Sequence, residues 1–494
     1  MKRCFSGKRN SRRDIPPPPR LCFLSLATHC NVAWQVFQQS TLSERAMITV
    51  RVPAVLLLAL LVFRAPGAAA MLRVVPAGGS ITAVLNEASP GDTVWLEGSD
   101  YRENLRIEVP VVLTGEGYPT IRGGYEGSVI DVLANGTVLK GLHVSEAGTF
   151  LTRDLACILV QADSVQVLDC RITRPLHGIY VKGGSWTLIR GNRIEGRLDL
   201  VEEDRGNGIH LWNSKRNHVL RNEILNVRDG IYFSFADSTL VEENYIHGVR
   251  YGLHYMYSNY NRFVDNLFEE NVAGAALMYS YKIVFLRNVF ARCRGFRAYG
   301  ILFQSMDSTL AESNLILDNS RGIFMNNTDF NTLINNDIVD NDLAIQLNGG
   351  CEGNRFLRNN FINNLSRLLL DVSDRETIWA DSTGGNFWSG YRGYDLDRDG
   401  VGDVPFDIQN VFQIMETKVP EVRFYLFSPA AEILKAAERS MPILDLGKAS
   451  DNRPLMNHSR NAGVPWDRVR EIRTASSPIF AVLFLLGFLL QGIY

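Results

Sequence analysis

Net charge is nearly absent from this sequence. Its 494 residues include 51 lysines and arginines and 53 aspartates and glutamates, so the formal charge at pH 7 is −2. A protein that binds nucleic acid through the phosphate backbone needs a clearly positive surface. We therefore expect no nucleic-acid partner.

Closely spaced cysteines are also absent. The four that follow residue 70 form no C-x-x-C motif and no zinc pattern. These four are Cys157, Cys170, Cys293 and Cys351. We expect Cys157 and Cys170 in the core, where cysteine behaves as a small apolar residue. If the protein is exported, a disulfide among the four cysteines is possible, but the sequence does not assign one.

A repeat dominates the middle of the chain. A glycine followed fourteen positions later by an asparagine recurs seven times, and most steps between these glycines are 22 residues long. The pairs are Gly178/Asn192, Gly208/Asn222, Gly230/Asn244, Gly252/Asn266, Gly274/Asn288, Gly300/Asn314 and Gly322/Asn336. A fixed period of this length indicates a solenoid in which each repeat stacks on the next.

Each repeat has the pattern of short strands. Apolar and other residues alternate after the glycines, as in 209–212 and 253–256, and alternation with period two predicts strands with one buried face. We therefore expect an all-β parallel β-helix over residues 71–364, with a helical cap at 80–88. The asparagines should lie inside and bond to one another along the axis. The glycines should form corners with positive φ.

The two ends of the chain differ from the repeats. Residues 1–46 are predicted to be an over-extended gene start, or else the cytoplasmic tail of an uncleaved anchor. Residues 47–70 have the charged region, apolar run and small-residue site of a secretory signal peptide, so we expect export with cleavage after Ala70. Within 474–494, residues 479–490 are almost all apolar, which predicts either a membrane anchor or an out-of-frame tail at a gene end.

An acidic motif follows the repeats, in the segment 365–419. Its D-x-D-x-D-G spacing resembles the start of a calcium loop, although Phe406 stands where an EF-hand has its last glutamate. The candidate calcium ligands are Asp395, Asp397, Asp399 and Asp403. The alternative is an acidic loop without an ion, packed against Trp388 and Tyr394, that closes the solenoid.

Four features over residues 73–454 together resemble the NosD family. They are A-S-P-G-D at 88–92 with L-T-G-E at 113–116, the 22-residue rungs, the block N-F-W-S-G-Y…GYDLDRDGVGDVPF at 386–406, and D-N-R-P-L-M at 451–456. The resemblance implies a right-handed parallel β-helix in the periplasm. It also implies docking on the membrane subunit of an ABC transporter, and delivery of copper or sulfur to nitrous oxide reductase together with a copper chaperone.

Two sets of residues could bind copper directly. If Leu253 and Tyr255 point inward, the intervening histidine and the following methionine point outward, and thioether and imidazole groups are suitable ligands for Cu(I). A second methionine lies one rung further on, about 4.8 Å away. The candidates are His254, Met256 and Met278 in the rungs, and Met456 and His458 in the tail. Their alternative role is packing under a loop or against a partner.

Residues 420–473 depart from the repeat pattern. Ser428 and Pro429 are suited to begin a helix, and the apolar residues that follow share one face. We expect this short amphipathic helix to contact the transporter.

The rival functional class is an extracellular polysaccharide lyase or hydrolase, or a carbohydrate-binding protein, built on the same fold. The tripeptide N-T-D at 327–329 is similar to one in polygalacturonases, but residues 346–350 of the next rung contain no carboxylate. Glycoside hydrolysis needs two carboxylates at a defined separation. We therefore expect no enzymatic activity, and a passive surface protein without a ligand is the third alternative.

Overall fold

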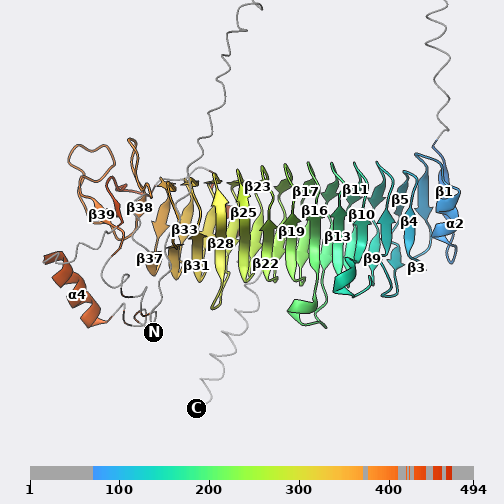
Figure 1. Cartoon of the computed structure of the whole chain (residues 1–494), viewed down its shortest axis with the longest axis horizontal. Coiled ribbons are helices and arrows are strands. Elements are labelled where there is room, and N and C mark those ends of the chain that lie inside the picture. The colour runs from blue at the N-terminus through green and yellow to red at the C-terminus, as the bar shows by residue number, and fades with distance from the viewer. Residues whose placement is uncertain are drawn as a thin grey trace, which may run out of the picture. The chain divides into compact units, whose positions relative to one another are not determined.

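The structure is a computed structural model that describes residues 70–370, 377–409, 428–440, 449–458 and 463–469, with the single positions 415, 419, 422 and 425. In the unit Ala68–Tyr494, parallel strands coil into a β-helix made of three long sheets (Figure 1). The predicted all-β fold is confirmed. The predicted leader, signal peptide and apolar tail lie outside the described residues, and no described helix is long and apolar enough to cross a membrane.

Each turn of the β-helix contributes one strand to each sheet, named here A, B and C. Sheet A contains, in spatial order, β1 (Leu72–Val75), β2 (Thr93–Leu96), β5 (Val112–Gly115), β8 (Val138–Lys140), β11 (Gln166–Leu168), β14 (Leu188–Arg190), β17 (His218–Leu220), β20 (Leu240–Glu242), β23 (Arg262–Val264), β26 (Val284–Leu286), β29 (Leu310–Glu312), β32 (Thr332–Ile334) and β35 (Arg355–Leu357). Sheet B contains β3 (Asp100–Arg102), β6 (Thr120–Arg122), β9 (His143–Ser145), β12 (Arg171–Thr173), β15 (Arg193–Glu195), β18 (Glu223–Leu225), β21 (Tyr245–His247), β24 (Leu267–Glu269), β27 (Val289–Ala291), β30 (Leu315–Leu317), β33 (Asp337–Val339), β36 (Asn360–Ile362) and β38 (Phe387–Trp388). Sheet C contains β4 (Leu105–Ile107), β7 (Ile130–Val132), β10 (Ala156–Val160), β13 (His177–Lys182), β16 (Asn207–Trp212), β19 (Asp229–Ser234), β22 (Tyr251–Met256), β25 (Ala273–Tyr281), β28 (Tyr299–Asp307), β31 (Arg321–Asn326), β34 (Leu343–Leu347) and β37 (Ser366–Leu370).

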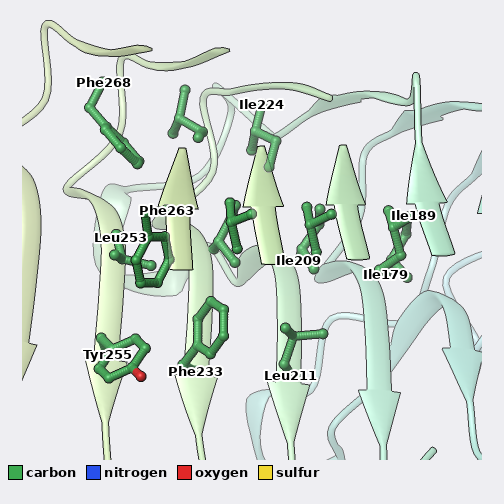
Figure 2. Packing of buried hydrophobic residues seen from close by; sticks show 14 of the residues in the cluster. Ile179, Ile189, Ile209, Leu211, Ile224, Phe233, Leu253, Tyr255, Phe263 and Phe268 are labelled. Carbon is green, nitrogen blue, oxygen red and sulfur yellow. The ribbon is translucent and has the colours of Figure 1, made fainter. Parts of the chain in front are cut away.

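The core is a continuous stack of inward-facing side chains. In sheet C, Ile209 pairs with Ile231, which pairs with Leu253 one turn later, and all three are fully buried. Figure 2 shows the same stacking for Leu211, Phe233 and neighbouring residues. Burial of these columns is the main stabilising contribution, since each apolar side chain is removed from water on both sides by its neighbours in the stack.

An asparagine column runs through the core at one corner, as predicted. The backbone N–H of Asn244 donates to Oδ1 of Asn266 at 3.0 Å, and its Nδ2 donates to the same oxygen at 2.9 Å. This pair of bonds links every member of the column: Asn192, Asn222, Asn244, Asn266, Asn288, Asn314, Asn336, Asn359 and Asn386. The sequence reasoning missed two shorter columns, Asn331–Asn354 and Asn319–Asn341–Asn364.

The prediction that the repeat glycines form positive-φ corners is wrong. All seven are described residues, and none of them has a positive φ. A Cβ at Gly252 would instead lie 2.6 Å from the carbonyl oxygen of Gly274 and 2.7 Å from the ring of Phe268. Glycine is needed because successive turns pack closely there. The positive-φ corners carry other residues, such as Glu243 with φ 53° and Asp265 with φ 53°.

The buried cysteines behave as predicted. Cys157 and Cys170 lie in the core, and burial raises the pKa of both thiols to about 12. Cys170 occupies the asparagine position of an earlier turn, and its N–H donates to Oδ1 of Asn192 at 2.9 Å. The thiols of Cys157, Cys170 and Cys293 are free.

Both ends of the β-helix are covered. At the N-terminal end the predicted cap is the helix α2 (Ile81–Asn86), which buries Ile81 and Leu85, while strand β1 before it was not predicted. At the other end, β39 (Phe406–Asp407) pairs antiparallel with β40 (Ser450–Asp451). The predicted amphipathic helix is α4 (Pro429–Ser440), and Oγ of Ser428 accepts the N–H of Ala431 at 3.2 Å.

A segment from the tail returns to the outer face of sheet B. Residues 463–469, named here the strap, place Val469 and Trp466 against outward apolar residues of β24, β27, β30 and β33. The indole Nε1 of Trp466 donates to Asp337 at 2.6 Å. The segment predicted as a docking extension, 420–473, therefore includes residues that pack on the β-helix itself.

Candidate functional site

The outer face of sheet C carries His254 and Met256 on β22 and Met278 on β25, named here the outer cluster. Leu253 and Tyr255 are fully buried, whereas His254 and Met256 are half-buried on the opposite face. Met256 and Met278 are register partners on adjacent strands. The structure therefore brings the two thioethers and the imidazole into neighbouring positions, as the alternation predicted.

Asp229, on the preceding turn, orients His254. Its carboxylate is completely buried and lies 2.9 Å from Nδ1 of His254. Arg250 donates two further hydrogen bonds to it, at 2.9 and 2.7 Å. Burial alone would raise the pKa of Asp229, but the hydrogen bonds from His254 and Arg250 outweigh burial, and its pKa lies below the usual value.

The Asp229 contact determines which ring nitrogen of His254 can bind a ligand. Because a carboxylate only accepts, Nδ1 carries the proton in this contact, and in the neutral imidazole the lone pair therefore lies on Nε2. Metal-binding histidines are commonly oriented by a carboxylate in this way. The sequence reasoning missed Asp229, since only the stacking of β19 on β22 places it beside the histidine.

A row of aromatic rings continues from the outer cluster along sheet C. The ring of Tyr232 lies 4.6 Å from His254 on one side and 4.6 Å from His210 on the other, and its hydroxyl donates to Sδ of Met256 at 3.8 Å. His210 is thus two turns from His254 and cannot share an ion with it. Burial lowers the pKa of His177 to about 4 and that of His210 well below its usual value, so both imidazoles are neutral at pH 7.

The acidic loop gathers three of its four candidate ligands. Carboxylate oxygens of Asp395, Asp397 and Asp399 all lie within 4.8 Å of one another. Asp403 is not in this group, and its Oδ2 accepts the N–H of Leu396 at 2.7 Å. Three clustered hard oxygen ligands suit a calcium ion, which usually takes six to eight oxygen atoms.

The closing block, defined here as residues 386–406 together with residues 449–458, packs differently from the expectation. Trp388 is buried and stacks on Phe361 at 4.1 Å, as expected for a residue that closes the core. Tyr394, in contrast, is 56% exposed. Tyr391 takes the expected structural role instead, because its hydroxyl donates to the carbonyl oxygen of Val404 at 2.7 Å and holds the loop.

The remaining candidate residues lie elsewhere. The N–H of Met456 donates to the carbonyl oxygen of Gly400 at 3.0 Å, and the ring of exposed His458 lies 5.9 Å from Phe387. This pair belongs to the closing block and is not brought together with the outer cluster. The N-T-D tripeptide lies at a corner, where Oδ1 of Asp329 accepts the N–H of Glu352 at 2.9 Å.

Comparisons with known proteins point to one family. A family model described as "Periplasmic copper-binding protein (NosD)" matches residues 190–393. The "Probable ABC transporter binding protein NosD" of Stutzerimonas stutzeri is 33% identical over 384 residues, which cover 74% of this chain and 87% of that protein. The protein of the same name from Pseudomonas aeruginosa is 35% identical over 383 residues, covering 74% and 89%.

Solved structures resemble the chain more distantly. The periplasmic alginate epimerase AlgG double mutant has a TM-score of 0.40 at 12% identity, covering 62% of this chain and 82% of that one. Similarity at this level is not informative about function. The sequence relatives decide the assignment, and the chain belongs to the NosD family.

Proposed function

We propose that this protein is a periplasmic accessory factor in the maturation of nitrous oxide reductase that carries out no covalent chemistry. The description of the family as periplasmic and copper-binding supports this proposal, as do relatives named as ABC transporter binding proteins. Copper is the cargo in this proposal, handed on through the outer cluster.

The observation that carries the proposal is the Asp229–His254 contact beside two methionines. Asp229 contacts Nδ1 of His254, so the neutral imidazole presents its lone pair at Nε2, and Met256 and Met278 lie in register on adjacent strands. One imidazole nitrogen and two thioethers form a soft ligand set that favours Cu(I) over hard cations. The half-buried position would let a partner reach the ion.

Transporter docking is assigned to helix α4. Ala431 of this helix is buried, whereas Ile433 is 71% exposed and Leu434 is 38% exposed. Exposed apolar residues on an amphipathic helix suit a groove on a partner. Other described parts of the tail are less suitable, because Asp451 already binds Asn386 of the asparagine column and the strap packs on sheet B.

A Cu(I) titration of the exported protein tests the cargo proposal, with and without sulfide. We expect the triple variant His254→Ser, Met256→Ser, Met278→Ser to lose the tightest Cu(I) site and to lower the copper content of the reductase in cells. The matched control is Met456→Ser, His458→Ser in the closing block. If only the control variant loses the Cu(I) site, Met456 and His458 are the copper ligands. Full copper loading of the reductase in a strain without the protein would refute the maturation role.

A second proposed site is calcium at Asp395, Asp397 and Asp399. The clustering of their oxygen atoms supports it, and these three residues fit a hard cation better than a soft one. The ion would have a structural role, since the loop adjoins the block that closes the β-helix.

A further inference from the structure

Strand β19 carries two side chains that contact the outer cluster. One is Asp229, whose carboxylate orients His254. The other is Tyr232, whose hydroxyl donates to the sulfur of Met256 at 3.8 Å. A single strand therefore contacts both the imidazole and one thioether of the ligand set, from the turn that precedes them.

The ring of Tyr232 is held on both sides. It meets the ring of His254 edge to face, at an angle of 88°, and the ring of His210 at an angle of 78°. His210 in turn stacks on Tyr180, with ring centroids 4.3 Å apart. Because the ring of Tyr232 can turn only if these neighbours move, its hydroxyl has a fixed direction toward the sulfur.

His210 supports this arrangement and is not itself placed to bind an ion. Both of its ring nitrogens are buried, and neither has a hydrogen-bond partner in the described part of the chain. A histidine that binds a metal is usually oriented by a hydrogen bond at its other ring nitrogen. His254 has such a bond, to Asp229, and His210 does not.

The hydroxyl contact matters because methionine is flexible. The side chain of Met256 has three rotatable bonds and is half-buried on an outer face, where packing restricts it less than in the core. A hydrogen bond to the sulfur uses one of its lone pairs and favours the conformers that make this bond. The second lone pair of the sulfur is then left for an ion.

The repeat gives Met278 a different neighbour at the same offset. Tyr232 pairs in register with His254, and Met256 pairs in register with Met278. His254 therefore stands to Met278 at the strand-to-strand offset at which Tyr232 stands to Met256. At this offset Met256 has a hydroxyl donor, whereas Met278 has the imidazole.

We infer that Tyr232 is a positioning residue that presents the sulfur of Met256 to a Cu(I) ion bound together with His254 and Met278; this inference rests on the proposed function. Tyr232 acts through Met256 and does not touch the ion. Loss of a residue that orients a metal ligand in this way typically lowers metal affinity about 10–100-fold.

The test removes the hydroxyl alone. Tyr232→Phe keeps the ring and its contacts with both imidazoles. Tyr180→Phe removes a hydroxyl two turns away in the same row of rings and is the matched control. For the exported protein we expect Kd for Cu(I) to rise about tenfold or more in Tyr232→Phe and to stay unchanged in Tyr180→Phe. X-ray absorption at the copper edge should show a smaller sulfur contribution in Tyr232→Phe.

A second measurement needs no copper. NMR spectra of protein labelled with ¹³C in the methionine methyl groups report on each thioether separately, and Met256→Leu assigns the resonance of Met256. In Tyr232→Phe we expect this resonance to move, because the side chain samples more rotamers without the hydrogen bond. The resonance of Met278 should stay in place.

Double variants separate positioning from packing. In a Met256→Leu background, Tyr232→Phe should have no further effect on Kd, whereas in a Met278→Leu background its full effect should remain. An equal effect in both backgrounds would overturn the inference, as would an unmoved Met256 resonance or the same rise of Kd in Tyr180→Phe. Tight Cu(I) binding by wild type with an unchanged Kd in Tyr232→Phe would overturn this inference alone, whereas a wild-type protein that binds no Cu(I) would refute the copper proposal as well.

Discussion

The carboxylate of Asp451 accepts the backbone N–H of Asn386 at 2.7 Å and so ends the asparagine column. Every other member donates this N–H to an asparagine of the next turn, but Asn386 is the last. The indole of Trp388 donates to the same carboxylate oxygen at 3.0 Å. A Cβ at Gly385 would lie 2.0 Å from the other carboxylate oxygen, so the approach of Asp451 requires glycine there.

Replacement of Asp451 should destabilise the closed end of the β-helix. Asp451→Ala leaves the N–H of Asn386 and the indole of Trp388 buried without an acceptor, which costs about 1–3 kcal/mol. Asp451→Asn keeps one acceptor oxygen and should recover part of the loss. Urea unfolding measures both, and equal stability of Asp451→Ala and wild type would contradict the assigned role.

The same carboxylate predicts a pH dependence. Burial raises the pKa of Asp451 above its usual value of 3.8, and the hydrogen bonds that it accepts only partly offset this. The folded state therefore binds this proton more tightly than the unfolded chain, so the contribution of Asp451 to stability falls as the pH rises through the raised pKa. Asparagine cannot titrate, so in Asp451→Asn this fall in stability with rising pH should disappear. If the stability of Asp451→Asn depends on pH in the same way as that of wild type, titration of Asp451 is not the cause.

Loss of one asparagine inside the column should be costly. Asn266→Leu removes the acceptor for both donors of Asn244, and we expect a loss of about 1–3 kcal/mol in the free energy of unfolding. Asn457→Leu at an exposed position of the tail is the control and should change stability by less than about 0.5 kcal/mol. A similar effect of both substitutions would show that the column does not contribute specifically.

Removal of calcium should destabilise the closing block if the acidic loop binds it. A chelator is expected to lower the melting temperature of the wild type but not of Asp397→Ala, since the variant has already lost one carboxylate of the cluster. Differential scanning calorimetry with added Ca²⁺ or chelator provides the measurement. If the chelator changes the melting temperature of both proteins equally, the acidic loop does not bind calcium.

The strap should stabilise the turns that it crosses. Trp466→Ala removes a half-buried indole and its hydrogen bond to Asp337, for which we expect a loss of about 2 kcal/mol. Trp186→Ala, at a 59% exposed position, is the control. Deletion of α4 alone should leave the melting temperature unchanged. A deletion that begins at residue 428 and removes the whole tail should lower it, because Asp451 and the strap are lost as well.

Repetition made most of the fold predictable. The 22-residue period and the alternation after each glycine predict stacked strands, because the same local preference recurs in every turn and stacking amplifies it. The inward asparagines were predictable for the same reason, since a buried amide must find partners and an identical neighbour supplies both donor and acceptor. His254 and Met256 were predicted to face outward from alternation alone.

Contacts between residues far apart in the sequence were decided by the tertiary structure. The repeat glycines were assigned to corners from their local preference, but their actual role follows from the distance to the next turn. Asp229 approaches His254 across a turn, Asp451 reaches Asn386 across 65 residues, and Trp466 reaches Asp337 across 129 residues. Such contacts have no signature in the local sequence, because they depend on which strands become neighbours after the chain has coiled.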